Sequence, residues 1–153
     1  MKIALGTDHA GFELKEAVKA HLENHGHEVA DYGAYEYDKD DDYPDFVLPA
    51  CWAVTDGEAE RAIVFGGSGQ GEAIAANKVT GVRAAVWYGG DGAIIELSRE
   101  HNNANVLSIG ARFVSVDEAL ETVDRWLETD FSNDERHVRR ITKFENANTH
   151  DAL

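Results

Sequence analysis

Residues 63–72 read IVFGGSGQGE, and this stretch indicates how the chain folds. An apolar run ends in four glycines within six positions, and helix-forming residues 72–78 follow. This order predicts a strand, a tight loop and a helix, an arrangement that leaves backbone N–H groups pointing at an anion. Glycine also lets the backbone take positive φ and approach a ligand closely. The alternative is an ordinary glycine-rich turn, with Glu72 as a first-turn acid favoured by the helix dipole.

The residues around the loop narrow its chemistry. Gly66 and Gly71 have the outer spacing of a P-loop, but Glu72-Ala73 stand where Lys and Ser or Thr would bind phosphates and Mg²⁺. The dinucleotide pattern G-x-G-x-x-G also fails, because the position three after Gly69 is Glu72. A carboxylate beside N–H donors instead suits a base that removes a proton while the donors hold the developing negative charge.

Length and composition bound the class of protein. With 153 residues we expect one domain over residues 1–145 and a frayed polar tail over 146–153. The formal charge of −15 argues against nucleic acid or anionic membrane as a partner, although a local arginine cluster can still bind a small anion. A single cysteine excludes an internal disulfide, and without a cleavable leader the cytoplasm is expected. No apolar run approaches the roughly 18 residues of a membrane span.

Strand-like and helix-like segments alternate along the chain. They predict a doubly wound, Rossmann-like three-layer α/β/α sandwich with a five-stranded parallel sheet. The expected strands are residues 2–6, 28–31, 62–65, 82–87 and 106–110. The expected helices are residues 10–24, 44–55, 72–78, 92–101, 116–127 and 133–146. Because such sheets bind ligands beyond the carboxyl ends of their strands, we expect residues 7–9, 66–72, 88–91 and 111–112 at one edge.

Three further features each admit a structural and a functional interpretation. Asp8 stands at the first strand-to-helix turn, where it either caps the next helix or serves the site. His101 ends a helix beside three asparagines, and it either complements the helix dipole or protonates a sugar oxygen. Residues 136–140, RHVRR, form either a solvated face paired with nearby acids or a phosphate clamp, because guanidinium binds phosphate bidentately.

The acidic run DKDDD at residues 38–42 has the alternate acids of a calcium loop. Its sixth and twelfth positions are Tyr43 and Pro49 rather than Gly and Glu, so we predict a solvated acidic loop. No set of His, Cys and Asp residues has zinc spacing, and no metal is predicted. Cys51, beside Trp52 in an expected helix, is predicted to be a packed small hydrophobe.

Taken together, these motifs resemble ribose-5-phosphate isomerase type B, the family that also contains galactose-6-phosphate and allose-6-phosphate isomerases. The matching stretches come in family order: GTDHAGFELK at 6–15, DYPD at 42–45, GSGQG at 67–71, AANKV at 75–79, GVRAA at 81–85, SREHNNANVL at 98–107, GAR at 110–112 and RHVRR at 136–140. Many members carry a cysteine base where this chain has Gly66. The chain is similar to an actinobacterial branch with a glutamate base at Glu72, and residues 133–135 replace the family's Gly-Gly.

The resemblance implies an aldose–ketose isomerase that interconverts D-ribose 5-phosphate and D-ribulose 5-phosphate through an enediolate, in the pentose phosphate pathway, without metal or cofactor. It implies that Glu72 is the base, that His101 of a neighbouring subunit opens the furanose ring, and that Ser68 helps hold the enediolate oxygen. The other implied substrate-binding residues are Asp8 at the sugar hydroxyls, Asn102 on the sugar, His9, Arg112, Arg136 and Arg140 on the phosphate, and Gly67, Gly69, Gln70 and Gly71 in the loop.

The resemblance also implies a homodimer, or a dimer of dimers, with shared sites. Two alternatives stay open: an isomerase of a four- or six-carbon sugar phosphate, and a nucleotide-binding sensor in which Glu72 is only structural. A glutamate at a helix N-terminus should have a lowered pKa, and partial burial would have to raise that pKa again for Glu72 to be a good base.

Overall fold

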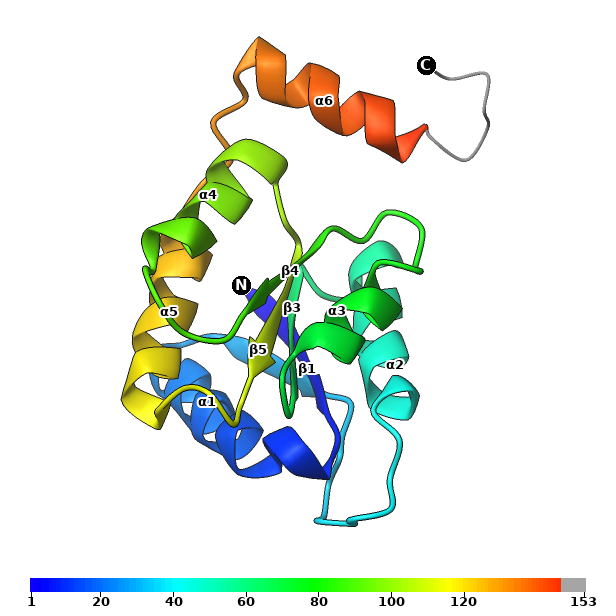
Figure 1. The fold of residues 1–153 in the computed structure, drawn as a ribbon, viewed down its shortest axis with the longest axis vertical. Helices are drawn as coiled ribbons and strands as arrows, with labels where there is room; N and C mark the ends of the chain where they lie inside the picture. Colours follow the sequence, from blue (N-terminus) through cyan, green and yellow to red (C-terminus); the bar gives the residue numbers. More distant parts are fainter. Residues whose placement is uncertain (147–153) are drawn as a thin grey trace.

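The computed structural model describes residues 1–146, which form five strands and the helices around them (Figure 1). The strands are β1 (Lys2–Thr7), β2 (Glu28–Asp31), β3 (Arg61–Gly66), β4 (Ala84–Trp87) and β5 (Val106–Gly110). The helices are η1 (His9–Gly11), α1 (Phe12–Asn24), α2 (Pro44–Thr55), α3 (Gln70–Ala76), α4 (Ala93–Asn102), α5 (Val116–Glu128) and α6 (Glu135–Glu145). Of the predicted tail only Asn146 is described, and residues 147–153 lie outside the described part.

All predicted strands and helices are present, with bounds within two residues of the prediction, and two of the differences lie near the glycine loop and Asp8. The helix after β1 opens as a short 3-10 turn because the Asp8 side chain accepts a hydrogen bond from the Ala10 N–H at 2.9 Å. Helix α3 begins at Gln70 and ends at Ala76, earlier than the predicted residues 72–78. Its first turn is therefore built from the glycine loop itself.

The sheet is parallel, in the order β2-β1-β3-β5-β4, which confirms the doubly wound α/β/α prediction. Large apolar residues of the strands, such as Leu5, Phe65 and Ile109, pack with α1, α4 and α5 on one face. Small residues, such as Ala4 and Ala62, pack with α2 and α3 on the other. The period-two alternation of strand side chains sorts the two sizes onto opposite faces.

The ends of β1, β3 and β5 lie at one level of the sheet. Thr7 pairs with Phe65 and Gly66 pairs with Gly110. After β1 the chain turns to α1 on one face, and after β3 it turns to α3 on the other (Figure 1). Because the two connections diverge, a crevice is left between them at the carboxyl edge, where doubly wound proteins bind ligands.

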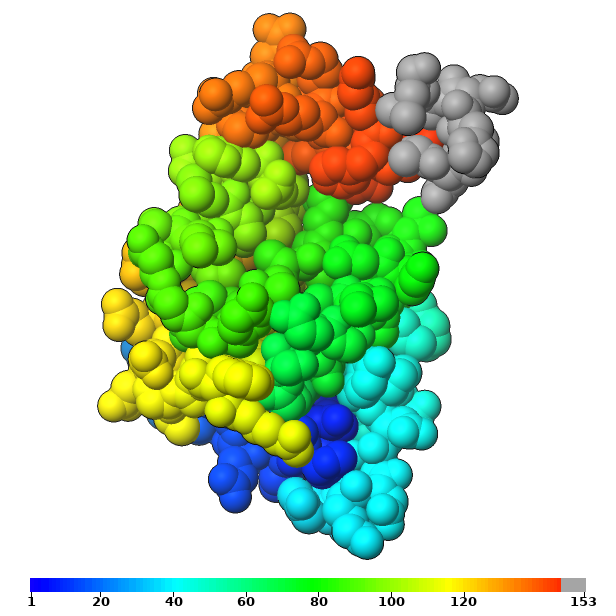
Figure 2. Space-filling model, in the orientation of Figure 1, coloured from blue at the N-terminus to red at the C-terminus, as the bar shows by residue number. Residues whose placement is uncertain are grey.

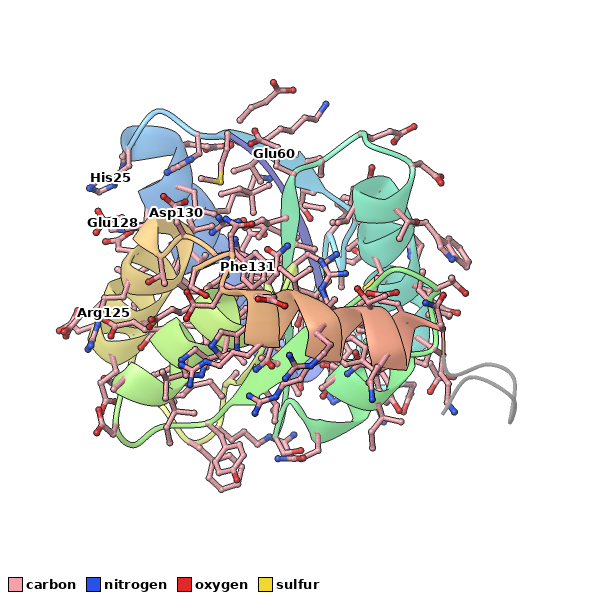
Figure 3. The ribbon with its side chains drawn as sticks, turned by 90° about the horizontal axis from the view of Figure 1, so that it is seen from above. His25, Glu60, Arg125, Glu128, Asp130 and Phe131 are labelled. Atoms are coloured by element: carbon pink, nitrogen blue, oxygen red, sulfur yellow. The ribbon has the colours of Figure 1, made fainter. Side chains whose placement is uncertain are left out.

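Helix α6 lies at the opposite end of the molecule. It contacts α4 and projects from the body, as the orange segment at the top of Figure 2 shows. Figure 3 looks down on this end, with α6 crossing in front of the sheet and Asp130 and Phe131 marking the connection from α5. No helix within residues 1–146 is long and apolar enough to cross a membrane.

Candidate active site

The Glu72 side chain fills the space above the last residue of β3. Glu72 lies in the first turn of α3 and is only 4% exposed. A Cβ atom placed on Gly66 would overlap the Glu72 carboxylate, with Oε1 the nearest atom. Glycine at position 66 therefore makes room for this carboxylate, and the carboxylate occupies the volume that a side chain at the start of the loop would take.

Burial raises the pKa of Glu72 above its ordinary value of 4.5. The negative charge of Asp8 acts in the same direction, whereas a hydrogen bond from the Glu72 backbone N–H opposes them. Burial thus prevails over the helix N-terminus, which is the balance that the sequence left open. A carboxylate with a raised pKa is a stronger base at neutral pH.

The glycine loop presents backbone donors beside this carboxylate. Gly69 has a φ of +75°, in the left-handed region that favours glycine. Its carbonyl accepts a 2.7 Å hydrogen bond from Ser108 Oγ, which fixes the loop to β5. The Gln70 N–H donates to Ser68 Oγ at 3.3 Å. Within residues 1–146 the N–H groups of Ser68, Gly69 and Gly71 donate to no protein acceptor, and those of the pocket-lining residues Ser68 and Gly71 suit an anionic oxygen.

A pocket of about 470 Å³ opens at this edge. It is lined by Asp8, His9, Ala10, Tyr43, Gly67, Ser68, Gly71, Glu72, Arg112 and Phe113. Seven of the predicted site residues, Asp8, His9, Gly67, Ser68, Gly71, Glu72 and Arg112, therefore meet in one place. Residues 88–91, which we expected at this edge, do not line the pocket, although Tyr88 contacts Phe113 with ring centroids 6.4 Å apart.

Tyr43 and Phe113 were not predicted as site residues. The Tyr43 hydroxyl would lie 2.8 Å from a Cβ on Gly71, so it faces the loop. Its position in the DYPD motif, just before α2, was the available signal. Phe113 follows Arg112 and is exposed, and its sequence context gave no signal of a site.

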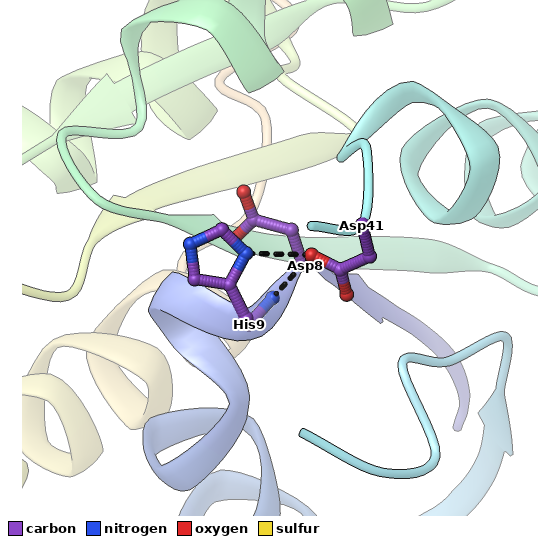
Figure 4. Close-up of side chains that lie close together, drawn as sticks. All are labelled: Asp8, His9 and Asp41. Carbon is purple, nitrogen blue, oxygen red and sulfur yellow. Dashed lines mark hydrogen bonds and ion pairs between the residues drawn. The ribbon is translucent and has the colours of Figure 1, made fainter. Parts of the chain in front are cut away.

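The position of Asp8 is compatible with both interpretations of the sequence. Its side chain caps η1 and is nevertheless at the pocket wall, with 7% of the residue exposed. Asp8, His9 and Asp41 place possible metal-binding atoms within 4.8 Å of one another (Figure 4). His9 Nδ1 lies 2.6 Å from Asp41 Oδ1, however, so these two atoms already bind each other. We therefore interpret the group as an Asp–His pair beside a capping aspartate.

The prediction of a solvated acidic loop at residues 38–42 is wrong for Asp41. Its side chain is 10% exposed and bonded to His9, whereas the Asp40 side chain is 78% exposed. The sequence could not distinguish the two acids, because the long connection from β2 to α2 has no regular period. The path of this connection in the folded chain determines that Asp41, and not Asp40, is turned inward.

His101, Asn102, Arg136 and Arg140 do not reach this pocket within one chain. His101 and Asn102 end α4 close to the start of β5, at the amino edge of the sheet. His101 stacks on His137, with ring centroids 4.3 Å apart and 12° between the planes. Arg136 Nε donates to His137 Nε2 at 3.1 Å. The predicted ring-opening residue His101 and the predicted phosphate-binding residues Arg136 and Arg140 thus lie at the far end of the molecule from the pocket.

The fold and the pocket define a Rossmann-like protein whose site joins a buried carboxylate, backbone N–H donors and an arginine, as proton transfer beside a carbonyl requires. The chain belongs to the ribose/galactose isomerase family, whose model matches residues 3–144.

Similar proteins include ribose-5-phosphate isomerase B of Mycolicibacterium paratuberculosis, 50% identical over 92% of this chain and 87% of the relative. Among solved structures, ribose-5-phosphate isomerase B of Clostridium thermocellum has a TM-score of 0.90 at 45% identity, covering 95% of each chain. The Mycoplasma genitalium ribose-5-phosphate isomerase B structure with bound ribulose-5-phosphate has a TM-score of 0.88 at 37% identity, covering 94% of this chain and 93% of that one.

Proposed function

We propose that this protein is an aldose–ketose isomerase that interconverts D-ribose 5-phosphate and D-ribulose 5-phosphate, with Glu72 as its base. The observation that carries the proposal is the Glu72 carboxylate filling the space over Gly66, beside the N–H donors of the glycine loop. Relatives 36–50% identical support the substrate, since most of them have the name ribose-5-phosphate isomerase B and one was crystallised with ribulose-5-phosphate.

In the open-chain sugar, Glu72 takes the proton from C2. The electron pair of that C–H bond forms a C1–C2 double bond, and negative charge develops on the C1 oxygen. Ser68 Oγ and N–H groups of the 67–71 loop hold this oxygen, because N–H donors fixed in place stabilise a developing oxyanion. Glu72 then returns the proton to C1, and the proton of the C2 hydroxyl passes to the C1 oxygen. Asp8 binds the sugar hydroxyls in this scheme.

A second subunit completes the site in this proposal. His101 of the neighbour opens the furanose ring, and its Asn102 holds the sugar. His9 and Arg112 bind the phosphate from one chain, and Arg136 and Arg140 bind it from the other. Support comes from the placement of these groups at opposite ends of the molecule, where one chain cannot bring them together. The working unit is therefore a homodimer or a dimer of dimers.

No metal is needed in the proposed chemistry, since backbone donors and Ser68 hold the charge that a metal would otherwise hold. We place the reaction in the cytoplasm and in the pentose phosphate pathway. A phosphorylated sugar carries charge and does not cross a membrane unaided.

The proposal is tested by a rate panel over four-, five- and six-carbon sugar phosphates, with and without a chelator. The expected result is highest kcat/KM on ribose 5-phosphate, unchanged by the chelator, with unphosphorylated ribose a very poor substrate. A higher kcat/KM on another sugar phosphate would assign that compound as the preferred substrate. A thermal shift with ATP and no turnover of any sugar phosphate would instead support the nucleotide sensor.

A further inference from the structure

The His9 backbone and side chain are both held by one oxygen of Asp41. The His9 N–H donates to Asp41 Oδ1 at 3.0 Å, and His9 Nδ1 lies 2.6 Å from the same oxygen (Figure 4). The two residues are 32 positions apart, so this contact pins the connection between β2 and α2 to the first turn after β1. It is one of the links between that connection and the pocket wall.

The pair is partly shielded from solvent. The side chains of His9 and Asp41 are 24% and 10% exposed, and the Tyr37 ring stands edge-on to the His9 ring at 5.9 Å. Within residues 1–146, Asp41 Oδ2 is buried and has no hydrogen-bond partner. An unsatisfied buried carboxylate oxygen costs stability. In the described part of the chain, the hydrogen bonds that the Asp41 carboxylate accepts come from His9.

The contact engages Nδ1 of the His9 ring. An ionised carboxylate only accepts hydrogen bonds, so the proton between the two groups belongs to Nδ1 of His9. Nε2 is then the nitrogen left for a ligand. An N–H at Nε2 can donate to a phosphate oxygen while Nδ1 stays on the Asp41 carboxylate.

We propose that Asp41 is a positioning residue that holds His9 with its Nε2 toward the phosphate of the substrate. The inference rests on the proposed function, because it takes the anion that His9 meets to be the sugar phosphate. Asp41 itself does not line the pocket and acts through the imidazole. The proposal thus gives a specific role to Asp41, whereas the other residues of the acidic run 38–42 are exposed.

The test compares Asp41→Asn and Asp41→Ala with the control Asp40→Asn. The control removes the same charge at the neighbouring position, where the side chain is exposed. Asn keeps an acceptor for His9 Nδ1–H and Ala removes it. The KM for ribose 5-phosphate should rise about tenfold in Asp41→Ala, as for a weakened charge-assisted hydrogen bond, and less in Asp41→Asn. The kcat value should change little in either Asp41 variant. Asp40→Asn should change neither kcat nor KM appreciably. In ¹⁵N NMR of the histidine rings, His9 should lose its fixed Nδ1–H signal in Asp41→Ala alone.

A double-mutant cycle separates positioning from loop stability. If Asp41 acts through the imidazole, Asp41→Ala should add little to the KM of His9→Ala. Full additivity, or an unchanged KM in Asp41→Ala, would overturn the inference. Binding of inorganic phosphate, followed through the His9 ¹⁵N signals, gives an answer that does not depend on turnover. Wild-type protein without isomerase activity would refute the proposed function, while weaker phosphate binding by Asp41→Ala would still support the role of Asp41.

Discussion

Glu72, the proposed base, holds an ionisable group in a buried position. Its carboxylate is buried against Gly66, and burial raises its pKa. Glu72→Gln keeps the shape and removes the base, so kcat should fall by about 10²–10⁴ with KM nearly unchanged. Steady-state kinetics on ribose 5-phosphate measures both values. Retention of more than about a tenth of the activity would exclude Glu72 as the base.

The pH dependence of the same residue has a definite sign. The base must be ionised, so activity should fall as pH drops through the raised pKa of Glu72. Stability should change in the opposite direction. Because the folded state holds the proton more tightly, wild type should lose stability relative to Glu72→Gln as pH rises from about 4.5 through the folded pKa. Urea unfolding at several pH values checks this, and a wild type that gains stability relative to Glu72→Gln over that range would contradict it.

Cys51 provides a control for the assignment of the base, because a cysteine base in this family would stand at position 66 and not at position 51. The thiol is fully buried in α2, and burial raises its pKa to about 12. A protonated, inaccessible thiol is unreactive. Cys51→Ser should therefore leave kcat/KM largely intact, and an alkylating reagent under native conditions should not inactivate the enzyme. Inactivation by the reagent that substrate prevents would place Cys51 at the active site and contradict Glu72 as the reactive centre.

At the scale of elements, the strands could be predicted because each has a period or an apolar run that ends in a turn signal. Val106–Gly110 and Pro44–Thr55 match the predicted bounds residue for residue. The glycine loop, Asp8 and Arg112 could be placed at one edge because parallel strands share an orientation. The segment between β2 and α2 could not be predicted in the same way. It brings Asp41 and Tyr43 to the site through contacts between distant residues.

Lys15 shows a second limit of sequence patterns. On α1 it lies among apolar residues, and its side chain is fully buried. Its ammonium group donates to both oxygens of Asp31, at 2.8 and 2.9 Å, and to the Ala34 carbonyl at 2.8 Å. A helical face with a lysine predicts solvent exposure, but here the lysine fixes the end of β2 and the start of the connection that carries Asp41.

Lys15→Met should destabilise the protein by about 3 kcal/mol, the lower end of the cost of breaking a buried ion pair. Lys19 provides the matched control, since it also contacts Asp31 at 2.8 Å but its side chain is 32% exposed. Lys19→Met should cost only about 0–1 kcal/mol. Urea unfolding of both variants measures the difference. Equal losses would show that burial of Lys15 does not control the strength of the contact.

Although burial opposes it, the hydrogen bonds from Lys15 and Lys19 lower the pKa of Asp31 below its ordinary value of 3.8. The stability that this carboxylate contributes is therefore present above about pH 3.8 and is lost as pH falls through the folded pKa. In Lys15→Met this acid-dependent part of the unfolding free energy should shrink. Lys15 bonds Asp31 at the end of β2 and the Ala34 carbonyl in the β2–α2 connection. Its loss should therefore affect both the acid dependence of stability and this connection.

At the scale of the whole molecule, the charged groups are divided between two ends. Glu72, His9 and Arg112 line the pocket at the carboxyl edge, whereas His101 and the α6 arginines lie at the amino edge. A chain with net charge −15 needs its few cations concentrated to bind a dianion. Two chains arranged antiparallel about a twofold axis would bring the two sets together twice.

Shared sites can be tested with two inactive variants, Glu72→Gln and His101→Asn, unfolded together and refolded as a mixture. In a mixed dimer one site receives both substitutions and the other receives neither. The mixture should then regain activity that neither variant shows alone, approaching about a quarter of wild type, since random pairing gives about half mixed dimers with one intact site each. Each variant refolded alone is the control. If both residues act within one chain, every site keeps one substitution and the mixture stays inactive. A fully active monomer by light scattering would equally contradict shared sites.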